Sequence, residues 1–162
     1  MTAILNGIKI VDLSRVLAGP YATQMLSDLG AEVIKVEAPW GDDTRKWGPP
    51  FTTGFDGKKV AAYFLSCNRG KEIININLKQ ETEKLKSLIA DADVIVENFR
   101  PGTLQRMLGS LPDDKIICSI SAYGKDGPRR DQPGYDIALQ ARSGIMSITG
   151  ERNGAPVKVG VA

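Results

Sequence analysis

The architecture of this chain follows from two apolar runs, Ile8-Lys9-Ile10-Val11-Asp12-Leu13 and Glu32-Val33-Ile34-Lys35-Val36-Glu37. Both are short and rich in β-branched residues, which is typical of buried strands. Between them, Gly19-Pro20 predicts the start of a helix over 20–29, because proline suits the first helical position, and Gly30 predicts its end. Strand, helix and strand in this order predict a βαβ unit with two parallel strands and a right-handed crossover.

The same alternation continues along the chain. Further strands are predicted over 74–78, 94–96 and 116–121, helices over 80–90, 103–108 and 136–143, a long loop over 38–59, and a final strand entered at 156–162. The fold class predicted is therefore α/β, a Rossmann-like, mostly parallel sheet with flanking helices, in one domain over 1–162. Ligands of such sheets bind beyond the carboxyl ends of the strands.

Taken alone, each residue at these strand ends allows two interpretations, one as a ligand contact and one as a purely structural residue. The Gly19-Pro20 turn either presents backbone N–H groups to a phosphate or carboxylate, or only starts a helix. Phe99 either stacks on a flat ring such as adenine, with Arg100 or Arg106 on a phosphate, or belongs to the core. No GxGxxG motif follows the first strand, so the usual dinucleotide fingerprint is missing.

Composition narrows the classes of function. The 162 residues carry 21 basic and 19 acidic side chains, interleaved, which predicts no nucleic-acid or membrane partner. The sequence has no histidine, so the commonest general base is missing, and a metal site is not predicted. Cys67 and Cys118 are predicted to be small buried residues in a reducing compartment. No leader or membrane span is recognised, which predicts a cytoplasmic protein.

Several motifs, in order, give the chain a specific resemblance. They are Leu5-Asn6-Gly7-Ile8, Ala18-Gly19-Pro20, Asp28-Leu29-Gly30-Ala31, Gly41-Asp42-Asp43-Thr44-Arg45, Asn68-Arg69-Gly70-Lys71, Asp93 to Gly102, Gly134-Tyr135-Asp136 and Gly144 to Gly150. The series closely resembles the class III coenzyme A transferases, the CaiB/BaiF family, over the whole chain. The loop at 41–45, followed by Trp47-Gly48-Pro49-Pro50, looks most like the succinate–hydroxymethylglutarate-type enzymes, with formyl-type enzymes nearby.

The resemblance implies a transfer of coenzyme A (CoA) between two carboxylic acids. In the family an aspartate attacks the thioester and forms a mixed anhydride and then an aspartyl-CoA thioester, with no prosthetic group and no metal. The implied partners are acyl-CoA, a small carboxylic or dicarboxylic acid and a second copy of the chain in an interlocked homodimer. The fold implied is the Rossmann-like large domain of the family, left incomplete.

The family's CoA-binding residues can be carried over position by position. The candidates are Val16, Ala18, Ile76, Asn77, Asn98, Phe99, Arg100, Arg106 and Tyr123. One position departs from the formyl-type pattern, because an arginine of that enzyme is Ala38 here. The grip on the adenosine phosphates is therefore expected to differ, or to come from Arg45, Lys46 or Lys71.

The family's nucleophilic aspartate follows the glycine matched by Gly160, at a position just past Ala162. The resemblance thus implies that this chain holds no catalytic residue, that it is an N-terminal fragment without the smaller domain, and that it is inactive. α-Methylacyl-CoA racemase also resembles the pattern, but it carries a histidine where Tyr135 stands. The residues are compatible as well with an inactive CoA-binding module or with a generic nucleotide-binding module.

Overall fold

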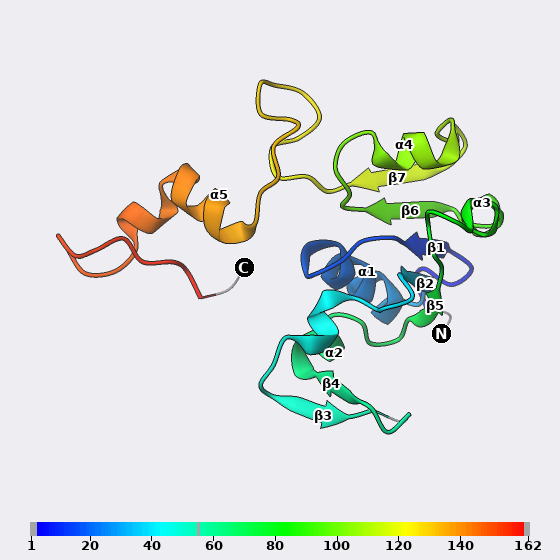
Figure 1. Cartoon of the computed structure of the whole chain (residues 1–162), viewed down its shortest axis with the longest axis horizontal. Coiled ribbons are helices and arrows are strands. Elements are labelled where there is room, and N and C mark those ends of the chain that lie inside the picture. The colour runs from blue at the N-terminus through cyan, green and yellow to red at the C-terminus, as the bar shows by residue number, and fades with distance from the viewer. Residues whose placement is uncertain (1–2, 55, 161–162) are drawn as a thin grey trace. The chain divides into compact units, whose positions relative to one another are not determined.

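A computed structural model describes residues 3–54 and 56–160 (Figure 1). The chain divides into two compact units, Met1–Ile120 and Ser121–Ala162. The first unit contains the strands β1 (Lys9–Asp12), β2 (Glu32–Glu37), β3 (Phe51–Thr53), β4 (Lys59–Ala61), β5 (Glu72–Asn75), β6 (Val94–Glu97) and β7 (Ile116–Ser119). Its helices are α1 (Ala18–Asp28), the 3-10 helix η1 (Asp43–Lys46), α2 (Ala62–Ser66), α3 (Thr82–Ala90) and α4 (Thr103–Leu108).

Five strands form one parallel sheet in the order β5-β2-β1-β6-β7. β1 is central: Val11 lies beside Ile34 of β2 on one side and Ile95 of β6 on the other. The predicted α/β class and parallel βαβ unit are confirmed, and β2 has the predicted bounds.

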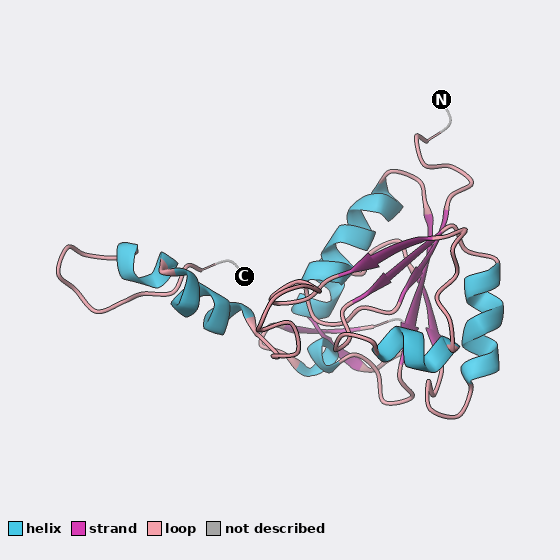
Figure 2. Ribbon diagram, turned by 90° about the horizontal axis from the view of Figure 1, so that it is seen from above, coloured by secondary structure: helices cyan, strands magenta, loops and turns pink. Residues whose placement is uncertain are grey.

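The sheet buries an apolar cluster on each face, because side chains alternate along a strand. Ile10 and Val11 belong to different clusters, and so do Ile95 and Val96. The first cluster contains Leu85 and Ile89 of α3 and Leu104 of α4. On the other face, Leu26 of α1 packs against the second. Figure 2 shows the helices on both sides of the strands, the layered arrangement that two-sided burial requires.

Two segments of the first unit differ from their predictions. β5 covers Glu72–Asn75 instead of 74–78, since its ladder with β2 ends at Asn75. The predicted alternation still holds in part, because Ile76 is buried in the first cluster and Ile74 and Leu78 pack against it. The predicted loop at 38–59 contains η1 and β3, and β3 pairs antiparallel with β4. Proline and glycine crowd this segment, and they hid a three-residue strand that only pairing reveals.

The second unit contains α5 (Asp136–Ser143) and the 3-10 helix η2 (Ile145–Ile148). α5 has the predicted bounds. The strand predicted from 156 onward is not formed in its described part, 156–160, and residues 161 and 162 lie outside the described residues. The Val157 N–H donates to the Met146 carbonyl at 3.2 Å, and the Val159 N–H to Gln140 Oε1 at 2.8 Å. These contacts hold the segment against helical residues, and a β ladder needs a neighbouring strand.

Candidate functional site

The strand order reverses direction between β1 and β6. The chain runs from β1 outward through β2 to β5, then returns to the other side of β1 for β6 and β7. In open α/β sheets this switch point opens a crevice beyond the carboxyl ends of the strands. The loops that border it here are 13–17, after β1, and 98–102, after β6.

Asn98 joins these two loops. Its Oδ1 accepts the Arg15 backbone N–H at 2.9 Å, and its Nδ2 donates to the Arg15 carbonyl at 2.8 Å. Both ends of the Asn98 amide thus bind the backbone of the same residue, Arg15, which lies 83 positions earlier in the chain. The pairing fixes the backbone at the mouth of the switch point, and it commits the Asn98 amide to the protein.

The first loop is tightly constrained next to this contact. Val16 has a φ of 71°, which is an outlier for a β-branched residue. Two residues later α1 begins, and a Cβ at Gly19 would collide with the Ser14 side chain. A left-handed residue beside a helix start is costly, by about 1–3 kcal/mol, and such residues concentrate at binding sites.

Asp12, the last residue of β1, accepts hydrogen bonds beneath this loop. Its donors are the Ser14 N–H at 2.9 Å, the Ser14 hydroxyl, the Thr23 hydroxyl at 2.6 Å and the Lys71 ammonium at 3.0 Å. Lys71 also donates to the Pro20 carbonyl at 2.7 Å and to Asn68 Oδ1 at 3.0 Å. The Asp12 and Lys71 side chains are fully buried, so this pair is a structural support for the loop.

Two more ion pairs lie at the end of β2, one buried and one partly buried. Lys35 approaches Asp42 at 3.2 Å and donates to the Ser14 carbonyl at 2.9 Å. Burial acts to raise the pKa of Asp42, but the Thr44 N–H and the Lys35 charge outweigh it and hold that pKa below its ordinary value.

Arg45 continues this network from η1. It donates Nε and Nη2 to Glu37 at 2.7 and 2.9 Å, and its guanidinium lies 3.8 Å from the centre of the Phe64 ring. The bidentate pair with Glu37 and the cation–π contact with Phe64 together fix the orientation of the Arg45 guanidinium.

The two cysteines differ. Burial raises the pKa of the Cys67 thiol, so Cys67 is a poor nucleophile, as expected for a buried structural thiol. Cys118 is exposed, which corrects the prediction of burial, because β7 is the edge strand of the sheet. Neither cysteine belongs to the loops 13–17 and 98–102 that border the switch point.

The predicted CoA residues lie in four places. At the switch point are Val16, Ala18, Asn98, Phe99 and Arg100, on the two loops and the first turn of α1. After β5 are Ile76, which is fully buried, and Asn77, whose amide bonds Gln80 at 3.0 Å. Arg106 donates to the Thr103 hydroxyl on α4 at 3.0 Å, and Tyr123 belongs to the second unit, where the Arg142 guanidinium lies 5.8 Å from its ring centre. Their contact with CoA stays a prediction.

Sequence reasoning did not single out Arg15, Lys35 or Asp12 as parts of this site. Lys35 is one of the alternating residues of a strand, and nothing local indicates that its side chain is buried. The strand-end position of Asp12 and Arg15 was the available signal, because each lies at or just past the end of β1.

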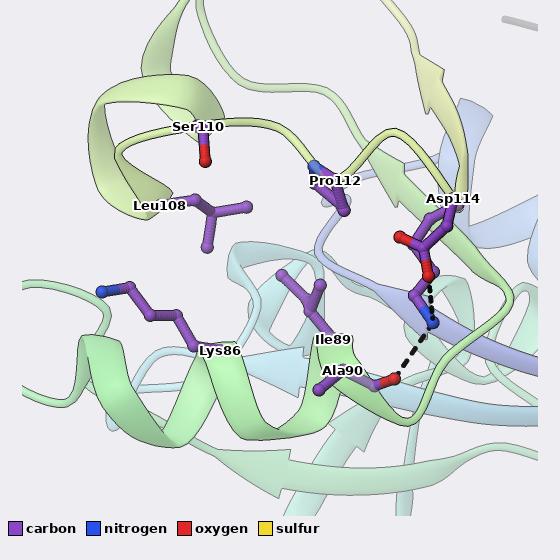
Figure 3. Close-up of a pocket in the computed structure, with 8 residues that line it drawn as sticks. Lys86, Ile89, Ala90, Leu108, Ser110, Pro112 and Asp114 are labelled. Carbon is purple, nitrogen blue, oxygen red and sulfur yellow. Dashed lines mark hydrogen bonds and ion pairs between the residues drawn. The ribbon is translucent and has the colours of Figure 1, made fainter.

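A separate pocket lies beside the edge strand β7, between the end of α3 and the residues that lead into β7 (Figure 3). It has a volume of about 360 Å³, and its lining includes the apolar residues Ile89, Leu108 and Pro112. Lys115 donates to the Ala90 carbonyl at 3.0 Å and pairs with Asp114 at 3.3 Å. None of the predicted CoA residues lines this pocket.

Metal ligands and membrane spans can be assessed for residues 3–54 and 56–160. Within them, no group of three or more acidic, cysteine or histidine side chains is placed to hold a metal ion. Within the same ranges, no helix is long and apolar enough to cross a membrane.

The strand order and the bridged loops define the class of the protein: a doubly wound α/β protein whose two loops at the switch point are joined by Asn98. A model of CoA-transferase family III matches residues 5–162. The chain belongs to this family.

Relatives with known names support the same assignment. The succinyl-CoA:glutarate CoA-transferase of Homo sapiens is 52% identical over 167 residues, covering 98% of this chain and 37% of the relative. The succinate–glutarate CoA-transferase of Agrobacterium fabrum is 48% identical over 168 residues, covering 98% of this chain and 42% of the relative. The chain thus spans about two fifths of the length of these curated relatives.

A solved structure agrees in detail. The crystal structure of a CaiB/BaiF family protein from Brucella suis matches with a TM-score of 0.92 and 45% identity. The match covers 99% of this chain and 44% of that chain. The resemblance predicted from the ordered motifs is confirmed, for the family and for the Rossmann-like fold.

Proposed function

We propose that this chain supplies the CoA-binding part of a transferase that moves coenzyme A between two carboxylic acids. Dicarboxylic acids such as succinate and glutarate are the proposed substrates, because the relatives described above are named for them. Family membership supports CoA as the substrate that carries the acyl group, and no prosthetic group is part of the proposal.

The observation that carries the proposal is the bridged switch point. Asn98 holds two strand-end loops together by both ends of its amide, at the place where doubly wound sheets bind nucleotide ligands. Phe99 and Arg100 follow directly. Phe99 packs against the first apolar cluster but is only partly buried, so we propose that the rest of its ring meets adenine and that the Arg100 guanidinium meets a phosphate.

The proposed chemistry needs only carboxylates and a thiol. An aspartate attacks the thioester carbonyl, the C–S bond breaks, and the CoA thiolate leaves behind an acyl-aspartyl anhydride. The thiolate then attacks the aspartyl carbonyl and releases the first acid, leaving an aspartyl-CoA thioester. Attack by the second acid and return of the thiolate complete the exchange, with no net redox change and the aspartate restored.

This chain does not contain that aspartate in our proposal, which places it just past Ala162. The buried Asp12 is not a substitute, because four hydrogen bonds, one of them from the fully buried Lys71, saturate its carboxylate. Asp136 also has a partner, since it accepts from Gln140 at 2.6 Å. A racemase is less well supported, since the sequence has no histidine at Tyr135 or anywhere else.

Calorimetric titration of the 162-residue protein with CoA, ATP and NAD tests the binding step. We expect CoA to bind more tightly than ATP or NAD, and a preference for NAD would count against the proposal. An assay of CoA transfer from succinyl-CoA to glutarate tests the chemistry. No turnover is expected, and turnover well above background would show that the nucleophile lies within the chain.

We also propose the interlocked homodimer for the complete protein, in the cytoplasm. Its support is the second unit, because among described residues 121–160 no apolar side chain is buried. Tyr135, Ile137 and Ile148 are between 56% and 85% exposed there, and exposed apolar side chains of this kind favour an interaction surface. Sedimentation measurements that show a monomer at all concentrations would contradict the dimer.

A further inference from the structure

The first loop of the site, residues 13–17, contains one cation, Arg15, which no sequence pattern singled out. Three other cations near the strand ends are already committed inside the protein. Lys71 donates to Asp12, Pro20 and Asn68, and Lys35 pairs with Asp42. Arg45, expected as a phosphate ligand, binds Glu37 bidentately, and Lys71, expected in the same role, is fully buried. A phosphate at the switch point must therefore meet a different charge, and the candidates are Arg15 of the first loop and Arg100 of the second.

Arg15 has the opposite arrangement. Its side chain is 55% exposed, and it forms a long ion-pair contact of 3.5 Å with the equally exposed Asp43. Its backbone, by contrast, is held at both its N–H and its carbonyl by Asn98. A fixed backbone beneath an exposed guanidinium is a suitable base for an anion ligand, because little backbone entropy remains to be lost on binding.

We propose that Arg15 binds the diphosphate of coenzyme A, which rests on the proposed function. The guanidinium presents a planar fork of donors that matches two phosphate oxygens. Arg15 also lies just before the strained Val16 and the start of α1, on the side of the crevice where doubly wound folds hold a diphosphate. Asn98 then acts as a positioning residue, since its amide bonds the Arg15 backbone.

Asp43 has a defined part in the proposal. In the free protein its carboxylate is the weak partner of Arg15, and on binding the diphosphate replaces it. Because Asp43 is itself negative and exposed, it competes with the ligand for the guanidinium. Its removal is therefore expected to act in the opposite direction from removal of Arg15.

The test compares variants of the whole chain in calorimetric titrations with CoA, dephospho-CoA, which lacks only the ribose phosphate, and pantetheine, which lacks the nucleotide. We expect R15Q to weaken CoA and dephospho-CoA equally, by about ten- to a hundredfold, and to leave pantetheine unchanged. R15K keeps the charge without the fork and should fall between. D43N should strengthen CoA binding by about two- to fivefold.

Arg69→Gln is the matched control. Arg69 is also an exposed arginine, it pairs with Asp28 at 2.6 Å, and it lies before β5, away from the switch point. The substitution removes the same charge and should leave CoA affinity unchanged. Circular dichroism and the unfolding midpoint of each variant show that the fold is kept.

Each outcome decides a point. Equal affinities of R15Q and R69Q for CoA would overturn the assignment of Arg15 while the proposed function stands. A loss with CoA but not with dephospho-CoA would also overturn it, because Arg15 would then meet the ribose phosphate. Failure of the unaltered chain to bind CoA would remove the proposed CoA site itself.

Discussion

The buried pair of Asp12 and Lys71 makes the most demanding prediction about this fold. Lys71→Met keeps the apolar stem and removes the ammonium, which leaves the fully buried Asp12 carboxylate without its cation. It also removes the donor from the Pro20 carbonyl at 2.7 Å and from Asn68 Oδ1 at 3.0 Å. Breaking a buried ion pair from one side costs about 3–5 kcal/mol of unfolding free energy. Whole domains have only about 5–15 kcal/mol, so the variant should be severely destabilised.

Urea unfolding followed by circular dichroism measures this cost. The double variant D12N/K71M removes the stranded charge, and we expect it to be more stable than K71M by about 1–3 kcal/mol. Lys58→Met is the control, since Lys58 is 85% exposed and pairs with Asp56 only at 3.6 Å. It should cost less than about 1 kcal/mol.

Two results would refute this reasoning. One is a K71M variant as stable as K58M, which would mean that the buried pair contributes nothing. The other is that D12N has the same cost with and without K71M, to within about 0.5 kcal/mol, which would mean that the two side chains are not coupled.

Two further predictions concern strain and pH. Val16 has a φ of 71°, a region that only glycine tolerates freely. V16G should therefore be more stable than V16A by about 1 kcal/mol, whereas in ordinary helices and strands alanine is the more stabilising of the two. Thermal unfolding of both variants measures the difference. The Asp42 pKa is lower in the folded protein than its ordinary value, so its contribution is complete above about pH 4 and is lost as the pH falls through the folded pKa. D42N should therefore cost about 3–5 kcal/mol at pH 7 and progressively less toward pH 3, and a cost independent of pH would contradict the role of its charge.

Much of the fold was predictable because its signals are local. The run at 32–37 gave β2 its bounds, and Pro133-Gly134 before Asp136 indicated the start of α5. The end of β5 was not predictable in this way. Ile74, Ile76 and Leu78 alternate like a strand and contact one cluster, but the ladder with β2 ends at Asn75.

The candidate site was predictable as a location and less so as a set of contacts. Strand-end positions singled out Phe99 and Arg100, since carboxyl ends of parallel strands meet at one edge, and the family resemblance added Val16 and Asn98. The partner of the Asn98 amide was out of reach of any sequence pattern, because it is the backbone of a residue 83 positions away. Every residue other than proline has the same backbone N–H and carbonyl groups, so the sequence does not show which of them a side chain will bind.

By itself the sequence determined the family, the alternation of strands and helices, and the edge of the sheet at which ligands are sought. These depend on apolar periodicity and on turn residues, which act over a few positions. The tertiary structure alone decided which charges are available at that edge. Lys35, Arg45 and Lys71 look as exposed as Arg15 in the sequence, but the fold places a carboxylate within 3.2 Å of each. Burial makes these pairs part of the protein's support and leaves Arg15 facing solvent, because an ammonium or guanidinium inside the protein must have a partner.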